Sequence, residues 1–148
     1  MSTLVLELRQ GDVMVVNGAP IRFRNRCRIE LTAKARFLFG KQIMAPEEAT
    51  TPARRIYFAL QTAYIGTDEE RERALVVAQR LISEFQAATT SSLARALLDR
   101  ALAAAEADEC YVALRLVRRV IRHEEAVLGG AGHGKAGGIV DQEEEVPA

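Results

Sequence analysis

The sequence predicts an α+β fold: an N-terminal antiparallel β meander of four to five short strands, followed by an antiparallel bundle of about four α-helices. Apolar residues recur at every second position within the first 44 residues, which is strand spacing, and at helical spacing from residue 52 onward. Turn and capping signals divide each half into short elements. We therefore expect a β-rich part at residues 1–45, a helical part at 46–128 and a disordered Gly-rich, acidic tail at 129–148.

The first strands are separated by recognisable turns. Residues 4–8 alternate leucines with other side chains, and the turn signal at residues 10–12 ends this strand. Asn17-Gly18 predicts a two-residue type I′ hairpin, because both central positions of that turn need positive φ. The resulting register pairs Val16 with Ala19, Val15 with Pro20 and Met14 with Ile21.

The next connection is expected to be a three-residue loop at residues 25–27, because a two-residue loop would mix polar and apolar faces. This loop pairs residues 21–24 with residues 28–31. Pro20 lacks a backbone donor, so the strand that contains it is predicted to be an edge strand or to be bulged. A further strand is expected at residues 35–39, with a turn at Gly40-Lys41. In this register one outward face carries Arg22, Arg24 and Arg28, with Arg26 at the loop tip.

Capping residues divide the second half into four helices. Thr51-Pro52 begins the first helix, which ends at Gly66, a favourable residue after a helix. The capping box Thr67–Glu70 begins the second helix, which runs to about Ala87. The third begins after residues 89–92, and Asp108 is expected to cap the fourth. The last helix is apolar on two sides, so we expect it to pack between partners, with a second copy of the chain as one candidate.

Composition indicates an ordinary globular protein, with 49% hydrophobic and 27% charged residues. No apolar run is long enough to span a membrane, and the N-terminus does not resemble a signal peptide. We expect a cytoplasmic protein in which Cys27 and Cys110 are buried, reduced thiols. The formal net charge is zero, but residues 1–60 carry 10 basic and 5 acidic side chains, so an anionic partner is expected there.

Signals of catalysis are weak. The two histidines, His123 and His133, lie on a charged helix face and in the Gly-rich tail, and no metal-ligand cluster, P-loop or dinucleotide-binding motif is present. The acid pairs Glu47-Glu48 and Glu124-Glu125 are interpreted as solvated side chains or helix-dipole partners. We therefore expect a protein that is not an enzyme and has no cofactor or metal.

The first basic cluster is the candidate RNA-binding surface. Guanidinium groups are flat, multidentate donors that fit phosphates and stack on unpaired bases. Taken alone, the pattern favours a solvated face with Glu7 and Glu30 as cross-strand ion-pair partners. The candidate residues are Arg22, Arg24, Arg26, Arg28, Lys34 and Arg36.

Two other basic clusters lie in the helical half. Arg54 and Arg55 oppose the dipole at the start of their helix, and we expect Glu47 and Glu48 to offset them. A stripe on the last helix is interpreted first as pairing with acids of the helical half, second as a partner-binding face and third as a nucleic-acid-binding face. The stripe consists of Arg115, Arg118, Arg119 and Arg122.

Two motifs resemble the FlbT family of alphaproteobacterial flagellar regulators. The first is GDVMVVNGAPIRF, and the second is the helix start at Pro52-Ala53-Arg54, with Ile56-Tyr57-Phe58 and Gln61. The resemblance covers residues 4 to about 128 and excludes the tail. The β-rich start also resembles, loosely, the RNA-binding regulator CsrA.

This resemblance implies post-transcriptional control of flagellin synthesis. It implies binding to the 5′ untranslated region of flagellin mRNA, with mRNA decay or repressed translation as the result. It also implies links to the partner FlaF and to flagellin, and we expect a homo-oligomer. It assigns no RNA-contacting residues, so the arginine surface is inferred from the residues alone. The alternative is a protein-interaction adaptor or chaperone-like module that binds FlaF or flagellin and affects mRNA indirectly.

Overall fold

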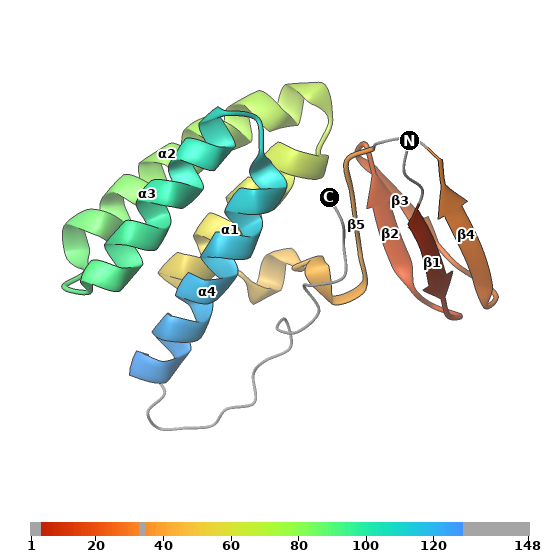
Figure 1. Ribbon diagram of the computed structural model, residues 1–148, viewed down its shortest axis with the longest axis horizontal. Helices are drawn as coiled ribbons and strands as arrows, with labels where there is room; N and C mark the ends of the chain where they lie inside the picture. The colour runs from red at the N-terminus through yellow and green to blue at the C-terminus, as the bar shows by residue number, and fades with distance from the viewer. Residues whose placement is uncertain (1–3, 33–34, 129–148) are drawn as a thin grey trace.

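The computed structural model describes residues 4–32 and 35–128, and it has the predicted α+β order (Figure 1). The strands lie beside one end of the helical layer, and the chain enters the helices through two 3₁₀ turns at Gly40–Gln42 and Pro46–Glu48. The strands are β1 (Leu4–Leu8), β2 (Val13–Val16), β3 (Ala19–Arg22), β4 (Cys27–Leu31) and β5 (Phe37–Phe39). The helices are α1 (Pro52–Ile65), α2 (Asp68–Ala88), α3 (Ser92–Glu106) and α4 (Cys110–Leu128).

The β2–β3 hairpin has the predicted turn and register. Asn17 and Gly18 have φ values of 52° and 87°, as a type I′ turn requires. Val16 pairs with Ala19, Val15 with Pro20 and Met14 with Ile21. β3 is the edge strand of a three-stranded sheet of order β3-β2-β5, so the position expected for Pro20 is confirmed.

The predicted pairing of residues 21–24 with residues 28–31 is wrong. β4 pairs instead with β1 in a separate two-stranded sheet, and residues 23–26 connect the two sheets. In this register Leu4 lies opposite Leu31 and Leu6 opposite Ile29, so apolar residues of the two strands lie on the same face. Leu6, Leu8 and Met14 are buried between the strands. Alternation within a strand predicts which face is buried, but it does not identify the neighbouring strand.

The predicted strand at residues 35–39 is present as β5, and it ends at Gly40, which has φ +59°. The helix starts at Thr51 and Thr67 also agree with expectation, and Thr67 and Glu70 form the predicted capping box. The expected capping of α4 by Asp108 is different, because Glu109 is the residue that immediately precedes this helix. Asp108 has φ +64° and lies in the turn between α3 and α4.

Gly66 ends α1 for a reason other than a left-handed conformation. Its φ is −78°, which any residue adopts. A Cβ at this position would lie 2.6 Å from the carbonyl oxygen of Thr62 and 3.0 Å from Oε1 of Glu70. The short turn from α1 into α2 therefore needs a glycine because the backbone and the capping carboxylate approach too closely for a side chain.

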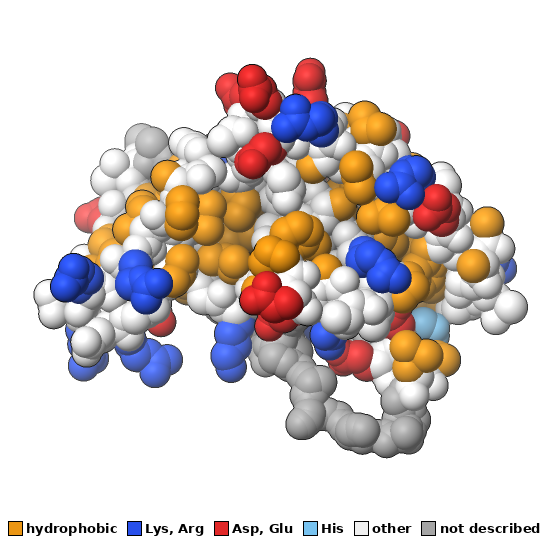
Figure 2. Space-filling model, turned by 180° about the vertical axis from the view of Figure 1, so that it is seen from behind, with side chains coloured by type: hydrophobic (Ala, Val, Ile, Leu, Met, Phe, Trp, Pro, Cys, Tyr) orange, Lys and Arg blue, Asp and Glu red, His pale blue; other side chains and the backbone are white. Residues whose placement is uncertain are grey.

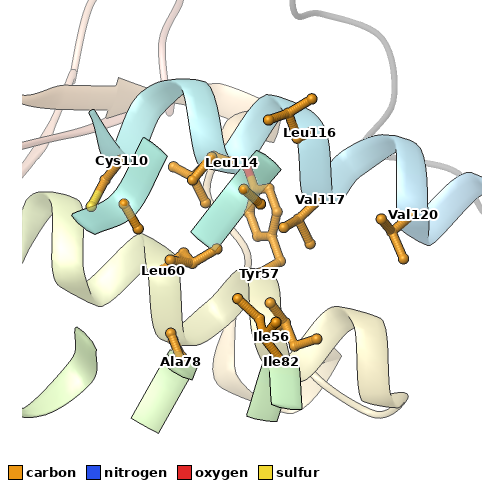
Figure 3. Close-up of a cluster of buried hydrophobic side chains, with 14 of the residues drawn as sticks. Ile56, Tyr57, Leu60, Ala78, Ile82, Cys110, Leu114, Leu116, Val117 and Val120 are labelled. Atoms are coloured by element: carbon orange, nitrogen blue, oxygen red, sulfur yellow. The ribbon is translucent and has the colours of Figure 1, made fainter. Parts of the chain in front are cut away.

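The helices enclose the main core, which also includes Leu38 of β5 and Met44 of the connection between the two 3₁₀ turns. Figure 3 shows Tyr57 and Leu60 of α1 near Leu114 and Val117 of α4, and Ile56 of α1 near Ile82 of α2. Polar contacts join the two parts of the molecule. Gln61 accepts a hydrogen bond from the Met44 amide at 2.8 Å and donates one to its carbonyl at 3.0 Å. The two parts are therefore connected by both packing and buried hydrogen bonds.

The expected pairing of Arg54 with Glu47 and Glu48 is wrong. Nη2 of Arg54 lies 2.9 Å from Oε2 of Glu125 on α4. The neighbouring Glu124 is buried, and its carboxylate accepts hydrogen bonds from the Thr51 hydroxyl and the Ala53 amide at the start of α1. A carboxylate there stabilises the positive end of the helix dipole. Both acids of α4 are thus directed toward α1.

Candidate nucleic-acid interface

Four exposed arginines lie within seven residues where the chain crosses from one sheet to the other. Arg22 ends β3, Arg24 and Arg26 lie in the connection, and Arg28 is in β4; we call these four residues the arginine arc. Figure 2 shows basic side chains at the end of the molecule formed by the strands. The sequence predicted that these arginines share one flat sheet face. In the structure they instead follow a turn of the chain that presents their guanidinium groups to solvent.

Arg28 is the one member of the arc that has an ion pair within the described part of the chain. Its Nε lies 3.6 Å from Oε2 of Glu7, with the two side chains 71% and 64% exposed. An exposed pair of this kind contributes at most about 1 kcal/mol and is screened by salt. The predicted cross-strand partnership is thus present for Glu7, and it leaves Arg22, Arg24 and Arg26 available to a phosphate.

The other two candidate RNA-binding residues are placed differently. Lys34 lies outside the described residues. Arg36 is half-buried, and its Nε donates a 2.9 Å hydrogen bond to the carbonyl oxygen of Tyr64 at the end of α1. Arg36 therefore joins β5 to the helices and is not part of the arc.

The predicted stripe on α4 divides into one buried and three exposed arginines. Arg118 is 2% exposed and lies over the ring of Tyr57, 5.6 Å from its centroid. Its Nη2 donates a 2.8 Å hydrogen bond to the Tyr57 hydroxyl, which donates in turn to the Gln42 carbonyl at 2.8 Å. Burial raises the pKa of Tyr57 against the opposing effect of the Arg118 charge, so this hydroxyl is protonated at neutral pH. Arg118 is thus part of the packed interior.

The three exposed members line a hollow between α3 and α4 with an arginine of α3, Arg100. The hollow has a volume of about 260 Å³, and Val112, Leu116 and Arg118 complete its lining. We call it the arginine groove, after its exposed residues Arg100, Arg115, Arg119 and Arg122. Arg100 was not predicted, because only the packing of α3 against α4 brings it to the stripe.

The expected pairing of these arginines with acids of the helical half is wrong for the described residues. None of Arg100, Arg115, Arg119 and Arg122 has a carboxylate within 4.0 Å there. The two acids of α4 itself, Glu124 and Glu125, are held at the start of α1. The groove is therefore a concentrated positive surface that can bind an anion.

A second hollow, of about 540 Å³, lies between α1 and α2. Its lining is mostly apolar and includes Phe58, Val77 and Leu81, with Arg55, Arg73 and Arg80 around them. Figure 2 views the molecule from this side and shows apolar side chains across it, with basic side chains beside them. This surface has the composition of an interface with another protein.

Groups suited to catalysis are not brought together in the described part of the chain. No cluster of three His, Cys, Asp or Glu side chains there is placed to hold a metal ion. His123 is half-buried on α4, and His133 lies outside the described residues. Cys110 is buried as expected, and burial raises the pKa of its thiol, whereas Cys27 is only half-buried; both are free cysteines. No helix of the described chain is long and apolar enough to cross a membrane.

Comparison with known proteins agrees with the two sequence motifs. The family model described as flagellar protein FlbT matches residues 4–128. A relative from Caulobacter vibrioides (strain ATCC 19089 / CIP 103742 / CB 15), named "Flagellum biosynthesis repressor protein FlbT", is 33% identical over 139 residues, covering 91% of this chain and 96% of the relative. A relative from Mesorhizobium japonicum, named "Probable flagellum biosynthesis repressor protein FlbT", is 31% identical over 132 residues, covering 87% of each chain. No solved structure matches.

The family match spans every strand and helix of the structure and ends where α4 ends. Residues 129–148 lie beyond it. The chain belongs to the FlbT family of flagellar proteins.

Proposed function

We propose that the protein represses flagellin synthesis by binding the 5′ untranslated region of flagellin mRNA through the arginine arc. The names of its relatives support a repressor role in flagellum biosynthesis, and the family is a regulatory one rather than an enzyme family. Bound protein would block ribosome loading or alter the leader structure, and a cellular nuclease would then degrade the message. RNA binding and decay are the parts of this proposal that need direct tests.

The observation that carries the proposal is the exposure of Arg22, Arg24 and Arg26 with no carboxylate partner within the described residues. They lie on a turn, which projects outward and fits a single strand or loop of RNA better than a flat sheet face does. Arginine binds phosphate oxygens with two donors at once and stacks on unpaired bases. Each phosphate contact releases counterions, so binding should weaken steeply with salt.

The test compares two triple variants with the same loss of charge. The first changes Arg22, Arg24 and Arg26 to Ala. The matched control changes Arg55, Arg73 and Arg80, which surround the α1–α2 hollow, to Ala. Affinity for a synthetic flagellin leader is measured from about 50 to 200 mM salt, the range over which phosphate contacts have their largest effect.

We expect the first variant to lose affinity and its log–log salt slope to become shallower by about 2, at roughly 0.7 per contact for single strands. The control should keep most of the wild-type slope. Equal slopes in the wild type and the arc variant, or equal losses in both variants, would remove the arc from the RNA site.

The second candidate function is an adaptor that binds FlaF or flagellin through its helical half. The arginine groove favours it, because four exposed arginines with no acidic partner in the described chain suit an acidic protein surface. Calorimetric titration of the full chain with purified FlaF and with flagellin tests this function. The groove variant is Arg119→Gln/Arg122→Gln, and the control variant with the same loss of charge is Arg73→Gln/Arg80→Gln. Binding that only the first pair of substitutions weakens, together with no RNA shift at low salt, would favour the adaptor.

A homo-oligomer is also part of the proposal. The α1–α2 hollow is the surface that we assign to a second copy, because its wall is mostly apolar and Val77 in that wall is 38% exposed. Light scattering of the wild type and of Val77→Asp after size exclusion tests this. The substitution should lower the measured mass, and equal masses would place the contact elsewhere.

A further inference from the structure

The arginine groove and the C-terminal segment of the chain have opposite charges. Residues 139–146 read IVDQEEEV and carry four acids within five positions. They lie outside the described residues and outside the family match. The groove presents four exposed arginines and no acid. We propose that this acidic segment binds the arginine groove of its own chain.

The side chains match in type as well as in charge. Asp141 and Glu143–145 can pair with Arg100, Arg115, Arg119 and Arg122, since carboxylates accept two parallel hydrogen bonds from a guanidinium group. Two apolar residues precede the acids and a valine follows them. The groove offers apolar surface between its arginines, where Val112 is 43% exposed beside Leu116.

The length of the connection allows this contact. Thirteen positions separate Asp141 from Leu128, the last residue of α4, and a chain of that length spans up to about 45 Å. Along the helix, Arg122 lies about 9 Å and Arg115 about 20 Å from Leu128, at 1.5 Å per residue. The acids therefore reach every arginine of the groove without any movement of α4.

Attachment to the same chain makes individually weak ion pairs effective. Exposed arginine–carboxylate pairs contribute little one at a time, and salt screens them. When the partner is attached nearby, binding becomes intramolecular and does not depend on protein concentration. The segment would then act as an internal competitor, and an acidic partner of the groove would have to displace it. This inference does not rest on the RNA proposal, because the arginine arc lies in the β-rich part of the chain and the groove lies between α3 and α4.

Paramagnetic relaxation in the full chain tests the contact. A nitroxide is attached through Ala148→Cys in a Cys27→Ser background, since Cys110 is buried. Amide signals are compared with those of a neutral segment that carries Asp141→Asn, Glu143→Gln, Glu144→Gln and Glu145→Gln. Signals near Leu128 should weaken in both, because the label is attached there through a short chain. The informative signals are those of Arg100 and residues 115–122.

We expect these informative signals to lose intensity with the acidic segment and to recover with the neutral segment or in about 1 M salt, where the Debye length is about 3 Å. Arg119→Gln/Arg122→Gln should also restore them, whereas Arg73→Gln/Arg80→Gln on α2 should not. A labelled peptide of sequence IVDQEEEV should bind the neutral-segment protein several-fold more tightly than the wild type.

Three results would overturn the proposal. Equal intensity loss with acidic and neutral segments would show that charge does not direct the segment. Intensity loss at the arginine arc, and not at the groove, would show that the segment binds a different surface. Loss that appears only between differently labelled molecules in a mixed sample would show binding to a second copy.

Discussion

Replacing Tyr57 by Phe removes one oxygen atom from a buried chain of hydrogen bonds and leaves the ring in place. The hydroxyl donates to the Gln42 carbonyl at 2.8 Å and accepts from Nη2 of Arg118 at 2.8 Å, and all three residues are at most 3% exposed. An unsatisfied buried group costs about 1–3 kcal/mol, and a bond to a charged group contributes about 1.5–3 kcal/mol. Because Arg118 has further interactions, we expect a total loss of about 3 kcal/mol in the free energy of unfolding.

Tyr111→Phe is the matched control. Its hydroxyl accepts one hydrogen bond, from Nε2 of Gln42, at 3.4 Å, and the residue is only half-buried. A bond of that length is weak, so the loss should be below about 0.5 kcal/mol. Urea unfolding followed by circular dichroism at 222 nm gives both values, with equal m-values as the condition for comparing them.

In thermal unfolding, the 3 kcal/mol loss corresponds to a midpoint about 10 °C lower for Tyr57→Phe. Equal unfolding midpoints for the two variants would refute the reasoning. Arg118 would then not be held by Tyr57, and its assignment to the interior rather than to a partner-binding face would lose its main support.

Three other predictions follow from particular contacts. Burial raises the pKa of Tyr57 and Tyr64, and that of Tyr111 to about 12, so the folded state holds these protons more tightly than the unfolded state, whose tyrosines titrate near 10. The free energy of unfolding should therefore be unaffected below pH 10 and fall between pH 10 and 12. Tyrosinate absorbance at 295 nm measures the titration of the three tyrosines, and titration of all three near pH 10 would contradict this prediction. Gly18→Ala should cost more than Gly11→Ala in urea unfolding, by about 1 kcal/mol, because both have positive φ but only a Cβ at Gly18 would press on Thr67, at 3.3 Å. Glu124→Ala should lower the free energy of unfolding by about 2–3 kcal/mol, because it leaves the buried Ala53 amide without its acceptor. Glu125→Ala breaks a partly exposed ion pair and should lower it by less than about 1 kcal/mol. Similar losses for the two variants would argue against the role of Glu124 at the start of α1.

The parts of the fold that depend on neighbouring residues were predictable from the sequence. The turn at Asn17-Gly18 and the capping box at Thr67–Glu70 are local, and both are present as predicted. The pairing of β4 was not predictable in the same way, because β1 and β3 both offer alternating apolar residues. The choice depends on which pairing buries Leu6 and Leu8, and that depends on the whole set of strands.

The partners of charged residues were even harder to predict from the sequence than the strand pairing, because the two members of an ion pair can be distant in sequence. Arg54 was assigned to acids seven positions or fewer away, and it pairs with Glu125, 71 positions away. The α4 stripe was expected to be neutralised by acids of the helical half, but the two acids of α4 itself make their contacts at the start of α1.

That placement is what makes the arginine groove a candidate site. A basic stripe on an isolated helix is ordinarily a solvated face, and one member of this stripe, Arg118, is in fact a core residue. Glu124 and Glu125 make their contacts at the start of α1, and packing of α3 against α4 adds Arg100 to Arg115, Arg119 and Arg122. The charge that remains on the groove is thus a consequence of tertiary structure. No carboxylate of the described residues pairs with it, and the acidic residues 141–145 are the part of the chain that we propose as its anionic partner.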